Sequence, residues 1–166
     1  MTTTPAIVVS DLVKRYKGAD RNAVDGVSFT VEQGSLFALL GPNGAGKTTT
    51  MRMIAGVSPR TSGTLEIFGH DPDLHGSEIR GQIGVVHQQE TLDMELTVRE
   101  NLLVFGRFFG MRRATIAERA DELLELFQLA DRAGDQVEPL SGGMKRRLSI
   151  ARSLIAAPRI LMLDEP

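Results

Sequence analysis

Short apolar segments with the spacing of β-strands recur along the chain. Residues 7–13 and 27–31 alternate β-branched with other side chains and are bounded by glycines, which predicts two strands of an antiparallel, hairpin-like layer. Residues 36–40 are continuously apolar, as in a strand of a parallel sheet with both faces covered. Further short strands are predicted at residues 63–68, 83–86 and 160–163.

The helical period replaces the strand period after residue 89 and continues for about 68 residues, which predicts an inserted helical subdomain. Thr97 and Thr115 are each followed three positions later by Glu, the capping-box spacing, so helices are predicted to start at both. A third helix follows residues 141–143 and ends near Ala157, because Pro158 disfavours continuation. A separate helix is predicted from Thr48 onward, closed by a glycine. The helix from Thr115 has one apolar stripe, made of Ile116, Ala120, Leu123, Leu124 and Phe127.

Composition narrows the class of protein. The 166 residues suffice for one domain, and 42% hydrophobic with 24% charged residues is typical of a folded chain. Lys and Arg number 19 against 21 Asp and Glu, so the chain has no broad positive field for nucleic acid. The absence of cysteine excludes disulfides, thiolate zinc sites and a cysteine nucleophile. No apolar window is long enough to cross a membrane.

A glycine-rich loop lies between the apolar run at residues 36–40 and the helix from Thr48. Its sequence, Gly-Pro-Asn-Gly-Ala-Gly-Lys-Thr, matches the phosphate-loop pattern in the strand and helix context that the pattern requires. The glycines allow successive amides to face a polyphosphate, Lys47 is predicted to reach the β- and γ-phosphates of ATP, and Thr48 to hold Mg²⁺. The alternative is an ordinary glycine turn before a helix. The predicted nucleotide-binding residues are Gly41, Pro42, Asn43, Gly44, Ala45, Gly46, Lys47, Thr48 and Thr49.

Two carboxylates follow the last predicted strand. Asp164 comes at the carboxyl end of residues 160–163, the edge at which open α/β sheets bind ligands, so it is a candidate Mg²⁺ partner. Glu165 is a candidate base that orients and deprotonates the attacking water. Taken alone, an acidic pair after a strand is commonly a turn or a helix cap, and the phosphate loop is what favours the metal reading.

The sequence Leu-Ser-Gly-Gly-Met at residues 140–144 resembles the signature motif of ABC-type ATPases, Leu-Ser-Gly-Gly-Gln, with Met144 where Gln is usual. The resemblance covers essentially the whole chain. It implies a head-to-tail dimer in which Ser141, Gly142 and Gly143 of one copy close on ATP held by the other copy. Ser141 is also a suitable N-cap, and the helix start beyond it is a potential anion site. The alternative is a capped helix with flexible glycines.

The same family implies the fold class and the way in which the chain divides into a core and a helical subdomain. The fold is α/β, a P-loop NTPase with a RecA-like parallel sheet core, an N-terminal antiparallel β layer and an inserted α-helical subdomain. Residues 1–88 and 158–166 are assigned to the core and the β layer, and residues 89–157 to the helical subdomain with the signature. In the family, more sheet and a switch His follow the Asp-Glu pair. We therefore expect a fragment, truncated at the C-terminus, of a protein nearer 300 residues, and negligible ATP hydrolysis by the 166-residue chain alone.

The family also implies roles for residues outside the three main motifs. Tyr16, the only tyrosine, stands where relatives stack an aromatic ring on adenine, with plain packing as the alternative. Gln88 stands where relatives use a Gln to contact Mg²⁺ or the attacking water, and Gln89 is the alternative. The aromatic residues Phe105, Phe108 and Phe109 are either helical core or the lining of a groove for a membrane subunit. Lys145, Arg146 and Arg147 are predicted to be a solvated helix face.

A narrower similarity is to the ATP-binding subunits of nodulation-factor exporters, which move lipo-chitooligosaccharides, and of drug exporters. It implies an ATPase that powers export through a separate integral-membrane permease, bound peripherally at the cytoplasmic face of the inner membrane. The implied partners are the permease and a second copy of the chain, with no nucleic acid, and the cofactors are ATP and Mg²⁺. The alternatives are a non-transport ABC ATPase of the translation-factor type and a nucleotide-binding fragment without turnover.

Overall fold

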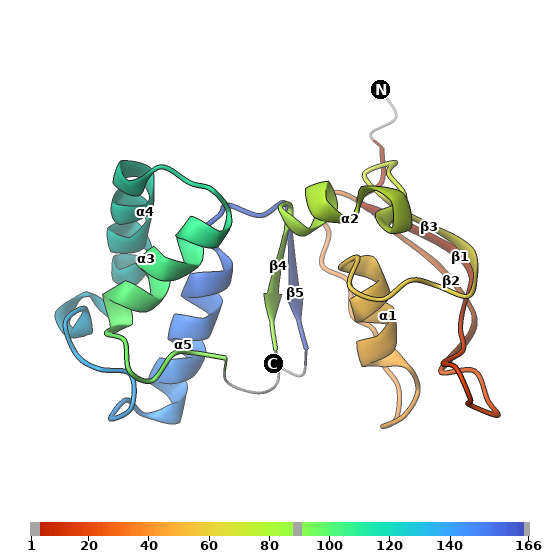
Figure 1. Cartoon of the computed structure of the whole chain (residues 1–166), viewed down its shortest axis with the longest axis horizontal. Helices are drawn as coiled ribbons and strands as arrows, with labels where there is room; N and C mark the ends of the chain where they lie inside the picture. The colour runs from red at the N-terminus through yellow and green to blue at the C-terminus, as the bar shows by residue number, and fades with distance from the viewer. Residues whose placement is uncertain (1–3, 88–90, 165–166) are drawn as a thin grey trace. The chain divides into compact units, whose positions relative to one another are not determined.

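A computed structural model describes residues 4–87 and 91–164 of the chain. The chain divides between Arg80 and Gly81 into two compact units (Figure 1). Unit 1 is the part of the chain that ends at Arg80, and unit 2 is the part that begins at Gly81. The described residues form two β-sheets, five α-helices and one short 3₁₀ helix, an α/β composition.

Unit 1 contains a three-stranded antiparallel sheet. Its strands are β1 (Ile7–Lys14), β2 (Val24–Val31) and β3 (Ser62–Ile67), in the order β2-β1-β3. Val9, in the central strand, faces Phe29 of β2 on one side and Leu65 of β3 on the other. The predicted antiparallel pairing of the first two strands is therefore confirmed, and β3 completes the sheet from a distant part of the sequence.

Two helices belong to unit 1. α1 (Lys47–Ile54) begins at the end of the glycine-rich loop, as predicted, and directs Thr50, Met53 and Ile54 inward. α2 (Pro72–Arg80) was not predicted, because its sequence has few apolar residues and contains Gly76; inside it, His75 has non-helical backbone angles. Its first turn has local signals, since Pro72 needs no helical donor and the Asp71 side chain accepts a hydrogen bond from the amide of Asp73 at 2.9 Å.

The prediction of a strand at residues 36–40 is wrong in this structure. Leu36 and Leu40 are exposed, and Phe37 makes a stacked contact with Phe29 at 4.9 Å between ring centroids. An apolar run becomes a strand only where a neighbouring strand supplies ladder hydrogen bonds. In the described part of unit 1, the sheet consists of β2, β1 and β3 alone, and none of these strands pairs with this segment.

Unit 2 contains a pair of parallel strands that are distant in sequence. β4 (Ile83–Val86) and β5 (Ile160–Leu163) have the predicted bounds and pair in register, from Ile83 with Ile160 to Val86 with Leu163. Gly84 allows a close approach, because a Cβ there would lie 2.5 Å from the carbonyl oxygen of Ser153. The pair agrees with the predicted parallel sheet.

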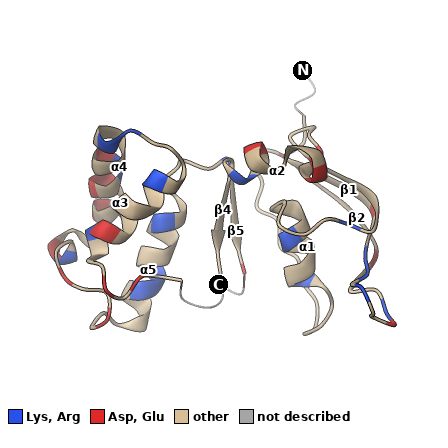
Figure 2. Ribbon diagram, viewed as in Figure 1, with Lys and Arg blue, Asp and Glu red and all other residues tan. Residues whose placement is uncertain are grey.

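The helices of unit 2 lie between these strands in the sequence. They are α3 (Val98–Phe108), α4 (Arg113–Leu126) and α5 (Gly142–Ser153), with the 3₁₀ helix Ala130–Arg132 before α5. Their inward side chains form one core, which includes four residues of the predicted stripe, Ile116, Ala120, Leu123 and Leu124, with Phe127 packed against it. Figure 2 shows acidic residues along α4 and basic residues along α5.

The predicted helix ends were partly correct. The capping box at Thr97 is confirmed, because Thr97 and Glu100 exchange side-chain and backbone hydrogen bonds. The second box is wrong: α4 starts at Arg113, and the amide of Ile116 already bonds to the carbonyl of Arg112 at 3.0 Å, so Thr115 lies inside the helix. α5 stops at Ser153, before the predicted end at Ala157, and the amide of Ile155 bonds to the carbonyl of Arg152, so the ladder tightens to i→i−3 bonds there.

Candidate nucleotide-binding site

The phosphate loop of unit 1 curls through two left-handed glycines. Gly44 has φ of 83° and Gly46 has φ of 86°, values that a side chain with a Cβ rarely adopts. The amide of Ala45 donates to the carbonyl of Pro42 at 3.2 Å, which closes the turn between them. The first hydrogen bond of the α1 ladder is that of Thr50 to Gly46 at 2.8 Å, so earlier amides face out of the helix end.

Gly46 also lies against the backbone that follows β1. A Cβ at this position would lie 2.3 Å from the carbonyl oxygen of Ala23 and 3.0 Å from a methyl carbon of Val24. A Cβ at Gly44 would meet nothing within 4 Å. The two glycines therefore have the same backbone conformation for different reasons, and only Gly46 is required by packing.

Lys47 places its charge over the loop that precedes it. Its ammonium donates to the carbonyls of Gly41 at 2.8 Å and Pro42 at 3.0 Å. A cation above a turn whose helix-end amides also point outward is chemistry suited to a polyanion. Thr48 is exposed in the first turn of α1, and its hydroxyl is an oxygen ligand of the kind that Mg²⁺ prefers.

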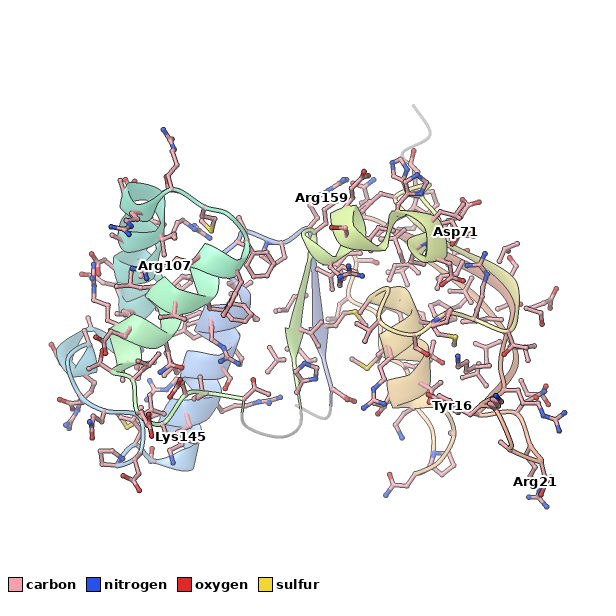
Figure 3. The ribbon with its side chains drawn as sticks, in the orientation of Figure 1. Tyr16, Arg21, Asp71, Arg107, Lys145 and Arg159 are labelled. Carbon is pink, nitrogen blue, oxygen red and sulfur yellow. The ribbon has the colours of Figure 1, made fainter. Side chains whose placement is uncertain are left out.

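Tyr16 lies just beyond the end of β1, and 43% of its surface is exposed (Figure 3). The ammonium of Lys14 lies 5.1 Å from the centre of its ring. Residues 16–23 form a loop that returns to β1, where the amide of Ala23 donates to the carbonyl of Lys14 at 2.7 Å. Because Ala23 also contacts Gly46, this loop links the tyrosine to the phosphate loop within unit 1.

The carboxyl edge of the parallel pair carries the predicted metal partner in unit 2. The amide of Asp164 donates to the carbonyl of Val86 at 3.0 Å, which extends the β4–β5 pairing by one residue. Gln88, its alternative Gln89, and Glu165 lie outside the described residues. In the described part of the chain, no group of three or more His, Asp or Glu side chains is arranged to hold a metal.

The signature residues are at the start of α5 in unit 2. Ser141 is the N-cap, and its hydroxyl accepts a hydrogen bond from the amide of Met144 at 3.3 Å. Ser141, Gly142 and Gly143 are exposed, and a Cβ on either glycine would meet nothing within 4 Å. Neither glycine has a positive φ, so nothing in the described fold of this chain requires glycine at these two positions.

Arginines of α5 bind the backbone on both sides of the segment 88–90. Arg146 donates to the carbonyl of His87 at 2.9 Å, and Arg152 to the carbonyl of Thr91 at 2.6 Å and to its hydroxyl. Arg147 donates to the carbonyl of Phe127 at 3.0 Å, so the prediction of a solvated face at residues 145–147 is wrong for both of its arginines. A usable signal was present, since α5 has four basic residues and no acidic one to pair with them.

The three phenylalanines at the end of α3 differ in burial, and the groove for a membrane subunit stays a prediction. Phe105 packs against the helical core, whereas Phe108 is 78% and Phe109 38% exposed. The guanidinium of Arg152 lies 4.8 Å from the Phe105 ring centre, and burial of this guanidinium lowers its pKa. Phe105 thus belongs to the core, and the other two rings lie at the surface beside it.

Comparisons with known proteins identify the family. The family model described as "ABC transporter" matches residues 24–166. The chain is 49% identical over 164 residues to the Nod factor export ATP-binding protein I of Ralstonia nicotianae, and 48% identical over 163 residues to that of Rhizobium meliloti. These matches cover 99% and 98% of this chain but 50% and 48% of the relatives, so the chain spans about half the length of the curated relatives it matches.

Solved structures of similar fold belong to the same family. The ATP-binding subunit of an ABC transporter matches with a TM-score of 0.84 at 30% identity, covering 97% of this chain and 66% of that one. The cbiO1 protein of Clostridium perfringens, part of the ABC transporter complex cbiONQ, matches with a TM-score of 0.87 at 26% identity, covering 98% and 66%. With the phosphate loop and the signature in place, the chain belongs to the ABC transporter family and has the P-loop NTPase fold of its ATP-binding subunits.

Proposed function

We propose that this chain is the ATP-binding part of the nucleotide-binding subunit of an ABC exporter, and that the full-length protein hydrolyses ATP. The observation that supports this most directly is the phosphate loop, with two left-handed glycines, the outward amides at the start of α1, and the Lys47 ammonium against the loop carbonyls. A triphosphate entering the loop replaces the carbonyl partners of Lys47 with phosphate oxygens, which form stronger, charge-assisted hydrogen bonds.

In this proposal the metal ligands are the three residues that the family resemblance implies. Thr48 provides a hydroxyl, Asp164 a carboxylate and Gln88 an amide oxygen, all hard oxygen donors that fit Mg²⁺. The bound Mg²⁺ would neutralise phosphate charge. Glu165 holds and deprotonates the attacking water, while Lys47 orients the phosphates, so the chain's own contribution is mostly positioning and charge compensation.

The signature supports a second copy of the chain as a partner. Gly142 and Gly143 are exposed and have no steric reason in this fold to be glycine, and Ser141 directs a capping hydroxyl at the same helix end. Such a surface suits the close approach of a nucleotide held by another copy, in the head-to-tail dimer that the family implies. Tyr16 stacks on the adenine in the same site.

A membrane permease is the second proposed partner. Phe108 and Phe109 present apolar rings at the surface near the C-terminal end of α3, where a membrane subunit can cover them. In the described part of the chain, no helix is both long and apolar enough to cross a bilayer. We place the protein peripherally at the cytoplasmic face of the inner membrane. Its similarity to Nod factor export proteins supports a lipo-oligosaccharide cargo.

ATP binding is the first test. Lys47→Ala should weaken the binding of Mg-ATP by at least about tenfold, because a charge-assisted contact to phosphate is lost. Lys145→Ala, a lysine of α5 without a proposed phosphate contact, is the matched control. Equal affinities for ATP in the unmodified chain and in Lys47→Ala would refute the proposal.

Hydrolysis is tested separately in the full-length protein. Glu165→Gln removes the proposed base but keeps the shape of the side chain, so ATP binding should persist, turnover should stop and an ATP-bound dimer should accumulate. Phosphate release and light scattering measure these outcomes. Hydrolysis at the unmodified rate would exclude Glu165 as the base.

A further inference from the structure

Lys14 is a buried cation that the proposed function does not use. Its side chain ends β1, and only 9% of the residue is exposed. The ammonium donates to the carbonyl of Pro59 and lies 5.1 Å from the centre of the Tyr16 ring. None of the ion pairs among the described residues includes Lys14. Its described polar partners are therefore one carbonyl and one aromatic face.

This arrangement fixes one side of the tyrosine. A cation within about 6 Å of an aromatic centroid is attracted to the face of the ring, and burial strengthens the attraction by removing competing water. Because the carbonyl of Pro59 accepts a hydrogen bond from the ammonium, the cation has an anchor besides the ring. The Lys14 face of Tyr16 is thus occupied, while 43% of the tyrosine surface remains exposed.

We propose that Lys14 is a positioning residue for the nucleotide base, which it aligns by holding the Tyr16 ring from behind. This proposal rests on the proposed function, since it needs a nucleotide in the phosphate loop. The base stacks on the open face of the ring, opposite the ammonium. Because the phosphate loop contacts Ala23 at the end of the same loop of the chain, a fixed ring holds the base at a fixed distance from the triphosphate.

Lys14 contacts the Tyr16 ring, on which the base is proposed to stack, so its effect on ligand affinity should depend on the base and not on the phosphates. The stacking is tolerant of base identity, because every base has a π-face. We therefore expect Lys14 to support ATP and GTP alike. A ligand without a base, inorganic tripolyphosphate, should not detect it.

The chain provides its own probe for this contact. Tyr16 is the only tyrosine and there is no tryptophan, so tyrosine emission from this chain reports on the proposed stacking position alone. ATP should quench this emission and tripolyphosphate should leave it unchanged. Because tripolyphosphate should not change the emission, its affinity is measured by calorimetric titration.

The deciding experiment is Lys14→Met, which keeps an apolar stem of similar length and removes the ammonium. ATP and GTP should bind about fivefold more weakly, and tripolyphosphate should bind as before. In the background Tyr16→Leu, where calorimetry replaces the emission, Lys14→Met should have no further effect. The proposal would be overturned if Lys14→Met weakened the binding of all three ligands equally or of none of them. It would also be overturned if Lys14→Met caused the same loss of ATP affinity in the Tyr16→Leu background.

Two controls keep the result interpretable. Lys14→Gln retains a donor for the Pro59 carbonyl without the charge, and it replaces the Met variant if that variant does not fold. Failure of the proposed function gives a different result, because Lys47→Ala would then leave the binding of both ATP and tripolyphosphate unchanged.

Discussion

The contact between Gly46 and Ala23 gives a prediction whose size follows from the structure. Gly44→Ala and Gly46→Ala introduce the same methyl group at nearly the same φ, 83° and 86°. A left-handed residue with a Cβ costs about 1–2 kcal/mol, partly offset by a stiffer unfolded chain, so Gly44→Ala should lower the free energy of unfolding by about 1 kcal/mol.

Gly46→Ala adds a steric term. Its new carbon would lie 2.3 Å from the carbonyl oxygen of Ala23, well inside van der Waals contact, so the backbone of one segment must move. Overpacking of this kind typically costs about 1–3 kcal/mol, which should appear as the difference between Gly46→Ala and Gly44→Ala. Since the displaced segment follows Tyr16, Gly46→Ala should also weaken ATP binding more than Gly44→Ala does.

Urea unfolding of the three proteins followed by circular dichroism, with ATP titrations at matched folded fractions, measures both effects. The reasoning requires a difference between the two variants. If they lose the same free energy of unfolding, the Ala23 contact does not determine the need for glycine at position 46, and the link from the tyrosine loop to the phosphate loop loses its support.

Two further predictions concern the frame that carries the site. Thr97→Ala should lower the free energy of unfolding by about 1 kcal/mol, because it removes the cap that bonds to Glu100. The matched change Thr115→Ala, inside α4, should have almost no effect on this free energy. Equal losses of the two variants in thermal unfolding would contradict the capping assignment. The guanidinium of Arg60 lowers the pKa of Asp71 from 3.8, so the stability that this pair provides is present above that value and is lost as pH falls through the lower pKa of the folded state. Arg60→Met should flatten this acid dependence, and unchanged acid unfolding curves would show that the pair does not contribute.

Local chemistry in the sequence was enough to predict the local backbone geometry of the candidate site. The left-handed glycines at 44 and 46, the helix that starts at Lys47 and the N-cap at Ser141 all depend on short-range geometry, and each has the expected form. The parallel strands β4 and β5 were also found with correct bounds, because both are short apolar runs with clear ends.

Local patterns failed where two segments competed or where the partner was distant. Thr115 has the residues of a capping box, but the chain enters the helix earlier through Arg112, and a cap pattern cannot report where the ladder begins. Arg146 and Arg147 read as a solvated face, because their acceptors are backbone carbonyls 59 and 20 positions away in the sequence.

The amino-acid sequence by itself determined the phosphate loop, the signature helix start and the identity of the family, since those depend on the type and spacing of adjacent residues. Only the tertiary structure decided that Lys14 lies behind Tyr16, that Ala23 requires glycine at position 46, and that residues 36–40 are unpaired in the described fold. The physical reason is range: turns and caps are formed within a few residues, whereas burial, cation–π contact and strand pairing depend on which distant segments meet.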